Sequence, residues 1–83
     1  MPVSSVNVLV QGGKLPEVRD QILETFGAEV HHPGGDYLVV VLVGDSAETI
    51  KDHFQLILAL EGVLSANVVY YNEEDLETSE EPL

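Results

Sequence analysis

Two stretches with the apolar spacing of an amphipathic helix, separated by runs of β-branched residues, constrain the fold of this chain most. In the first stretch the apolar side chains recur at gaps of three or four, at Leu15, Val18, Ile22 and Phe26. Pro16 lies near the start of this stretch, where a missing N–H costs no helical hydrogen bond. Gly27 follows it and is a typical helix stop. The spacing therefore predicts a helix between the double glycine at 12–13 and Gly27.

A second helix is predicted after Gly44. Its apolar positions are Ala47, Ile50, Phe54 and Ile57. Asp45 is a favourable N-cap residue, and Glu48 follows three positions later, which is the spacing of a capping box. The pair Glu61-Gly62 marks the end of this segment.

Four valine-rich or otherwise β-prone runs surround the two helices and predict strands at residues 3–10, 28–32, 37–43 and 63–71. The tetrapeptide at 33–36, Pro-Gly-Gly-Asp, is a hairpin signal between the second and third runs. The order of elements is βαββαβ. It predicts an α+β, ferredoxin-like sandwich, in which a four-stranded antiparallel sheet of strand order 4-1-3-2 carries both helices on one face. We expect this single domain to span residues 1–72.

The charge of the chain is strongly acidic, because 15 Asp and Glu face only three Lys and Arg, for a formal net charge of −12. Six of the acids lie in residues 73–83, which predicts an acidic, disordered tail that either keeps the chain soluble or competes for a basic ligand. Residues 1–72 retain nine acids and three bases. This balance argues against nucleic acid as a partner and favours a basic one, or simply solubility.

Residues with metal-binding or catalytic chemistry are few. The chain has no cysteine, which excludes a disulfide, a thiolate metal site and a cysteine nucleophile. His31 and His32 are consecutive on a predicted strand and point to opposite faces, and His53 has no apparent partner. We therefore expect no metal, no cofactor and no enzymatic activity. No run approaches the roughly 20 apolar residues that cross a membrane, so we expect no membrane insertion, and a cytoplasmic protein.

The sheet face that the helices leave open is the predicted binding face. Alternation along the strands sorts the two faces: Val6, Val8 and Val10 go to the core, as do Ala66, Val68 and Tyr70. The third strand is apolar on both sides, and we assign Val39, Val41 and Val43 to its core side. The predicted binding-face residues are Ser5, Asn7, Leu9, Gln11, Leu38, Val40, Leu42, Ser65, Asn67, Val69 and Tyr71.

This face has an apolar centre and a polar rim, with Asn7 and Asn67 expected close together. Such a pattern is typical of an interaction site, for a ligand or for a second copy of the chain. The uninterrupted apolar run at 56–60 is wider than a core stripe requires. We therefore expect a monomer or a weak dimer.

Three segments resemble the NapD family, small cytoplasmic assembly chaperones of periplasmic nitrate reductase. They are Val6-Asn7-Val8-Leu9-Val10-Gln11, Asp45-Ser46, and Glu61-Gly62-Val63-Leu64-Ser65-Ala66-Asn67-Val68-Val69-Tyr70-Tyr71 before the acidic tail. The resemblance covers about residues 3–75. It implies a non-catalytic protein that binds the twin-arginine signal peptide of the nitrate reductase catalytic subunit and delays export until the molybdenum cofactor is inserted. The alternative is a regulatory ferredoxin-like module that dimerises through its sheet or binds a small metabolite.

Overall fold

The elements follow the predicted order in the computed structural model, which describes residues 2–73. They are β1 (Pro2–Val10), α1 (Leu15–Phe26), β2 (Glu29–Gly34), β3 (Tyr37–Val43), α2 (Ala47–Leu58) and β4 (Val63–Glu73). The predicted tail at 73–83 lies outside the described residues apart from Glu73, which ends β4. The predicted domain boundary at 72 stays a prediction.

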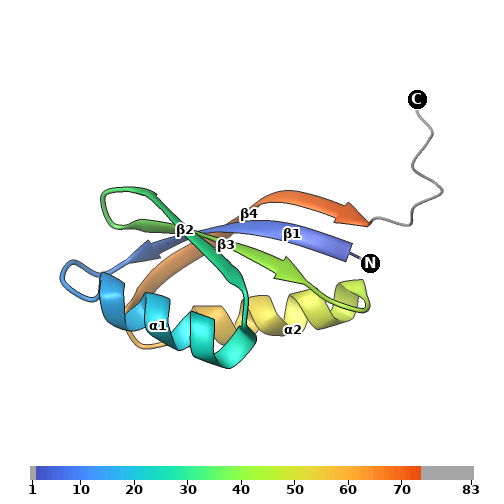
Figure 1. Ribbon diagram of the computed structural model, residues 1–83, viewed down its shortest axis with the longest axis horizontal. Helices are drawn as coiled ribbons and strands as arrows, with labels where there is room; N and C mark the ends of the chain where they lie inside the picture. Colours follow the sequence, from blue (N-terminus) through green and yellow to red (C-terminus); the bar gives the residue numbers. More distant parts are fainter. Residues whose placement is uncertain (1, 74–83) are drawn as a thin grey trace.

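The sheet is antiparallel throughout and has the strand order β2-β3-β1-β4, as predicted. Both helices cover one face of it, α1 over β2 and β3, and α2 over β1 and β4 (Figure 1). The α+β, ferredoxin-like sandwich is therefore confirmed, and within residues 2–73 no helix covers the opposite face of the sheet. That uncovered face is called the open face below.

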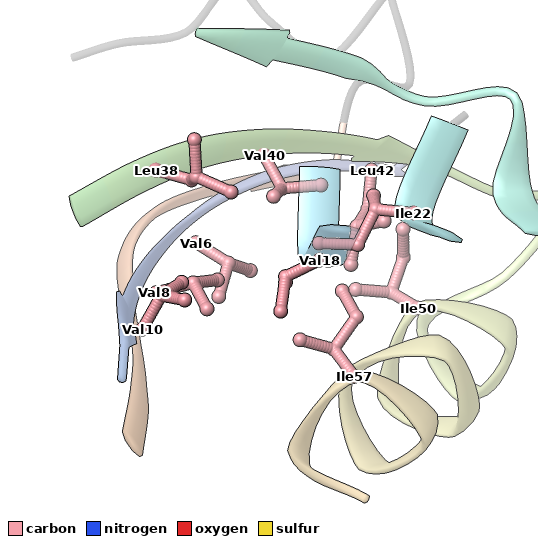
Figure 2. Packing of buried hydrophobic residues seen from close by; sticks show 10 residues of the cluster. All are labelled: Val6, Val8, Val10, Val18, Ile22, Leu38, Val40, Leu42, Ile50 and Ile57. Atoms are coloured by element: carbon pink, nitrogen blue, oxygen red, sulfur yellow. The ribbon is translucent and has the colours of Figure 1, made fainter. Parts of the chain in front are cut away.

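The core lies between the sheet and the helices, and its buried members among the described residues are aliphatic side chains (Figure 2). Its members are Val6, Val8, Val10, Val18, Ile22, Leu38, Val40, Leu42, Ile50 and Ile57, all at most 5% exposed. Burying one such side chain is worth about 1.5–3 kcal/mol. These ten residues are therefore the main source of stability in so short a chain.

The assignment of the two faces of β3 was wrong. Leu38, Val40 and Leu42 lie in the core and not on the open face, while Val39 and Val41 are half-buried on the other side. The reason is the pairing with β1, in which Val40 stands opposite Val6 and Leu38 opposite Val8. Directly opposite residues of an antiparallel pair point to the same side of the sheet, so the core residues of β1 determine those of β3.

The end of α1 lies where it was predicted, whereas the N-cap of α2 lies one residue later than predicted. Gly27 ends α1 with a left-handed backbone (φ 60°), and its N–H donates to the Leu23 carbonyl at 2.9 Å. The N-cap of α2 is Ser46 and not Asp45. Ser46 is the last extended residue before the helix, and its Oγ accepts the Thr49 N–H at 3.2 Å. Its hydroxyl thus satisfies one of the N–H groups that have no partner inside the helix.

Two irregularities in the pairing of β1 with β4 change which residues of β4 face the helices. The register steps from Val6 opposite Val68 to Ser5 opposite Tyr70, so Val69 is left without an opposite residue. A second shift, between Leu9 and Val10, leaves Leu64 without an opposite residue as well. Extra residues of this kind are β-bulges, and each one reverses the alternation of the strand beyond it.

The first bulge overturns the assignment of the two tyrosines. Tyr70, expected in the core, stands opposite Ser5 on the open face, and Tyr71, expected on the open face, stands opposite the buried Ser4 on the helix side. The Ser4 hydroxyl donates to the Tyr70 carbonyl at 3.1 Å, beside the bulge. The Ser4 side chain is fully buried, and this bond gives its hydroxyl a hydrogen-bond partner.

Candidate binding face

The open face consists of successive rungs of residues that stand opposite one another on neighbouring strands. The pairing registers give its members as Glu29 and His31 of β2, Tyr37, Val39, Val41 and Val43 of β3, Val3, Ser5, Asn7 and Leu9 of β1, and Ser65, Asn67, Tyr70 and Asn72 of β4. One rung runs from Glu29 through Val41 and Ser5 to Tyr70. The next joins His31, Val39, Asn7 and Asn67 across all four strands.

Large apolar side chains are exposed on this face and at its bulge. Tyr70 is 52% exposed, Val43 50% and Tyr37 42%, and Val69 at the bulge is 60% exposed. They come from two strands that flank β1, so apolar surface extends across the sheet and is not confined to one edge. Exposed apolar side chains with polar groups among them are typical of an interaction surface.

The centre of the face is polar and not apolar as predicted, because Val40 and Leu42 lie in the core and Asn7 and Asn67 lie at the middle of the face. Asn7 of β1 stands directly opposite Asn67 of β4, which confirms that these two residues lie close together. Within residues 2–73, neither side-chain amide is hydrogen-bonded to another residue. Each amide offers two donors and one acceptor. The pair can therefore hydrogen-bond to the backbone or the side chains of a ligand lying across β1 and β4.

The structure separates the predicted binding-face residues into three groups. Those that lie on the open face are Ser5, Asn7, Leu9, Ser65 and Asn67, and their role in binding stays a prediction. Val69 lies at the bulge, and Gln11 lies just after β1 with its N–H bonded to the Gly62 carbonyl at 2.7 Å. Those that face the helices are Leu38, Val40, Leu42 and Tyr71.

Nine open-face residues were not among those predicted: Val3, Glu29, His31, Tyr37, Val39, Val41, Val43, Tyr70 and Asn72. Those on β3 follow from aligning this strand with the unambiguous core set of β1, where Leu9 stands opposite Tyr37. Tyr70 has no such signal, because the bulge at Val69 has no distinctive residue in the sequence.

Charged groups are sparse on this face. Among the described residues on it, only Glu29 and His31 are ionisable apart from the tyrosines, and the Glu29 carboxylate bonds the His31 ring. Half of the described carboxylates lie on the helices, at Glu17, Asp20 and Glu24 of α1 and at Glu48 and Asp52 of α2. The negative charge of the domain therefore surrounds the apolar face and does not cover it.

Two hollows border the sheet. One, of about 240 Å³, lies where α1 runs into β2 and is lined by Phe26, Glu29, Val41, Val43 and His53, together with the 27–28 backbone and Leu42. In it the Phe26 and His53 rings are 5.0 Å apart. The other, of about 290 Å³, lies on the helix side between α2 and β4 and is almost entirely apolar. Of these two hollows, the first borders the open face, where Glu29 lines it together with the half-buried Val41 and the exposed Val43.

Within residues 2–73, no three His, Asp or Glu side chains lie together in a group that would hold a metal ion. Neither helix of that range is long and apolar enough to span a membrane.

The fold and the open face define a small ferredoxin-like domain with exposed apolar side chains on the open face of its sheet. The NapD protein family model matches residues 1–75, and the chain belongs to this family. The resemblance seen in the sequence is thereby confirmed.

Two solved structures are similar to the chain. The solution structure of NapD, the Tat proofreading chaperone protein of E. coli, matches with a TM-score of 0.76 and 25% identity, over 98% of this chain and 86% of that one. The C-terminal domain of the MgtC protein from Mycobacterium tuberculosis matches with a TM-score of 0.57 and 15% identity, over 89% of this chain and 90% of that one. The second match concerns the fold alone. No curated protein sequence matched the chain.

Proposed function

We propose that this protein is a chaperone that binds the twin-arginine signal peptide of the periplasmic nitrate reductase catalytic subunit. By holding the peptide in the cytoplasm, it delays export until the molybdenum cofactor has been inserted. Membership of the NapD family carries this proposal, supported by the similarity to the Tat proofreading chaperone of E. coli. The protein acts by binding and not by catalysis, and it needs no cofactor of its own.

We assign peptide binding to the open face. A twin-arginine peptide has a basic start followed by a moderately apolar stretch. Exposed Tyr37, Val43 and Tyr70 offer apolar surface to the second part, and Asn7 and Asn67 offer hydrogen bonds between them. The acidic domain attracts the first part, because charge complementarity steers encounter and sets orientation.

The size of the face is compatible with useful affinity. Burial of about 400 Å² of apolar surface on the protein side contributes on the order of 10 kcal/mol at about 25 cal/mol per Å². The loss of translational freedom and the ordering of the peptide cost several kcal/mol of this. The remainder corresponds to a dissociation constant in the micromolar to nanomolar range.

Two neighbouring tyrosines give a matched test of the face. Tyr70 is 52% exposed on the open face, and Tyr71 is 44% exposed on the helix side. In calorimetric titrations with the signal peptide, Tyr70→Ala should weaken binding, while Tyr71→Ala should leave it nearly unchanged. Urea unfolding of both variants checks that the fold is retained. Equal affinity of the two variants for the peptide would contradict peptide binding on the open face.

The family function is tested separately by titrating the wild-type protein. The signal peptide should release or absorb heat and move the amide signals of β1, β3 and β4, and the absence of both effects would refute the function itself. Replacing the two arginines of the peptide by glutamine should weaken binding more at low salt, because salt screens the attraction. A stable dimer that the peptide does not dissociate would favour the alternative, a module that dimerises through the same exposed face.

A further inference from the structure

The hollow between the end of α1 and the start of β2 has the size of a site for one side chain. We call it the α1–β2 hollow, and its volume is about 240 Å³. A cavity of about 150 Å³ is enough to hold benzene, so this hollow has room for one long side chain. The pairing of β2 with β3 begins at Glu29 opposite Val41, and the hollow lies just before this pair, where α1 passes into β2 (Figure 1).

Three features make the α1–β2 hollow attractive to a cation. Glu29 lines it, and while Oε2 of its carboxylate bonds the His31 ring, Oε1 has no partner within residues 2–73. The end of α1 lines it at Gly27; a helix C-terminus carries partial negative charge, and α1 has no basic residue in its last turn to offset this charge. The Phe26 ring also lines it, and the faces of aromatic rings attract cations.

The same groups favour arginine over lysine as the occupant. A guanidinium group is planar, stacks on an aromatic ring and donates two parallel hydrogen bonds to a carboxylate, whereas an ammonium group is a compact point charge. Phe26 is half-buried, and its ring packs against His53 with the centroids 5.0 Å apart and the planes tilted by 53°. The hollow therefore offers a guanidinium group a supported ring to stack on and a carboxylate acceptor.

A second hollow lined by carboxylates, at the start of α1, lacks these features. It contains its own cation, since Lys14 lines it and lies 3.7 Å from the Glu17 carboxylate, while Arg19 lies 3.5 Å from Asp20. The start of a helix carries partial positive charge, and no aromatic ring is among the described residues that line this hollow. Its third carboxylate, that of Glu61, therefore serves as a matched control.

The α1–β2 hollow is continuous with the open face. Glu29 begins the rung that runs through Val41 and Ser5 to Tyr70. Three strand spacings of about 4.8 Å separate the ends of this rung, or roughly 14 Å. An extended peptide spans this distance with about four residues, and a helical one with about ten. A peptide with a basic residue in the hollow can therefore place the apolar residues that follow over Val43 and Tyr70.

We propose that the α1–β2 hollow binds the guanidinium group of one arginine of the signal peptide, stacked on Phe26 and hydrogen-bonded to Glu29. The inference rests on the proposed function and adds to it the place of the basic start of the peptide and the reason for arginine. The open face then binds the apolar part of the same peptide. One charge-assisted hydrogen bond to this arginine corresponds to roughly tenfold in affinity.

A lysine-substituted signal peptide tests the site against charge alone. With both arginines changed to lysine the peptide keeps its charge, and the wild-type protein should bind it roughly tenfold more weakly in calorimetric titrations. Glu29→Gln and Phe26→Leu should each reduce this preference for arginine, whereas the matched controls Glu61→Gln and Phe54→Leu should retain it. Urea unfolding checks the fold of each variant, and Glu29 is exposed, so its substitution leaves the core intact.

Two outcomes of these titrations count against the site. Equal affinity of the wild-type protein for the arginine and lysine peptides would overturn the arginine site and leave the proposed function standing. A preference for arginine that Glu29→Gln leaves unchanged would also overturn it, because the preference would then arise elsewhere on the protein.

A single blocked arginine tests the hollow without the signal peptide. Millimolar N-acetylarginine amide should move the backbone amide signals of Gly27 and Ala28, and N-acetyllysine amide should move them less. The response to the arginine compound should be lost in Glu29→Gln and kept in Glu61→Gln. Equal shifts with the two compounds would overturn the proposal. A protein that responds to the arginine compound but does not bind the signal peptide would refute the proposed function alone, and the hollow would remain an arginine site.

Discussion

Two adjacent valines of β3 test the placement of the core more sharply than any other pair. Val40 is fully buried opposite Val6, and Val41 is half-buried on the open face opposite Ser5. The substitutions Val40→Ala and Val41→Ala remove the same two methyl groups from neighbouring positions of one strand. They therefore differ in the side of the sheet that loses the methyls and not in chemistry or β-propensity.

The expected effects differ several-fold. Two methyl groups taken from a closed core cost about 1.6 kcal/mol of transfer free energy, and the cavity left behind raises the loss to about 2–2.5 kcal/mol. In a domain of this size, that lowers the melting temperature by roughly 8–20 °C. On the open face the same deletion leaves no closed cavity, and we expect a loss of about 0.5 kcal/mol or less.

Urea unfolding followed by circular dichroism measures both losses, and titration with the signal peptide measures binding. Val40→Ala should unfold at clearly lower urea with an unchanged m-value, while the fraction that remains folded binds peptide normally. Val41→Ala should show the opposite pattern, near-native stability with weaker binding. If Val41→Ala were as destabilising as Val40→Ala, the assignment of the β3 faces from the register would be wrong.

Two further predictions concern the backbone. Gly62 has φ +98°, and a Cβ there would lie 2.9 Å from Cγ2 of the buried Val18. Gly62→Ala therefore combines backbone strain with steric overlap, and urea unfolding should show a loss of at least about 2 kcal/mol in the free energy of unfolding. Gly35→Ala, with a positive φ but no atom within 4 Å, should cost about 1 kcal/mol, and equal losses would exclude the contact as a cause. Ser46→Ala removes the α2 N-cap and should lower the free energy of unfolding by about 1 kcal/mol, whereas Asp45→Ala should leave it almost unchanged. A larger loss for Asp45→Ala would show that Asp45 is the cap.

The sequence was sufficient for the elements because each has its own strong local signal. The helical spacing that ends at Gly27 located α1, and the β-branched runs located the strands. The strand order followed from the βαββαβ succession, because a chain this short can pack these elements in only a few topologies. The N-cap of α2 was misplaced by one residue, because Asp45 and Ser46 are both favourable cap residues, and β2 runs two residues past its predicted end, to Gly34.

The binding face was less predictable, because it depends on how strands pair and not on any one strand. β3 is apolar on both sides, so alternation alone could not choose between Val40 and Val41; the register with β1 decides it. In β4 the bulge at Val69 exchanges the positions of Tyr70 and Tyr71. A one-residue change of register moves every later side chain to the other face.

The distribution of charge predicts two distinct electrostatic effects on peptide binding. Glu29 lies on the open face beside the hollow lined by Phe26, whereas Glu24 lies exposed on α1, behind the sheet. The Debye length is about 8 Å at about 0.15 M salt and about 30 Å at about 0.01 M. A carboxylate on the helix side therefore acts on an approaching peptide only at low salt, and one on the open face also acts in the complex.

Glutamine substitutions at these two positions separate the effects by kinetics. Glu24→Gln should lower the association rate constant modestly at low salt and leave the dissociation rate constant unchanged, as for charges away from the contact. Glu29→Gln should raise the dissociation rate constant, and this change should persist at physiological salt, because the group lies within the contact. Stopped-flow mixing with a fluorescent signal peptide measures both constants. If the two variants dissociated at the same rate, the basic part of the peptide would not contact the β2 edge of the open face, and the acidity of the domain would serve encounter alone.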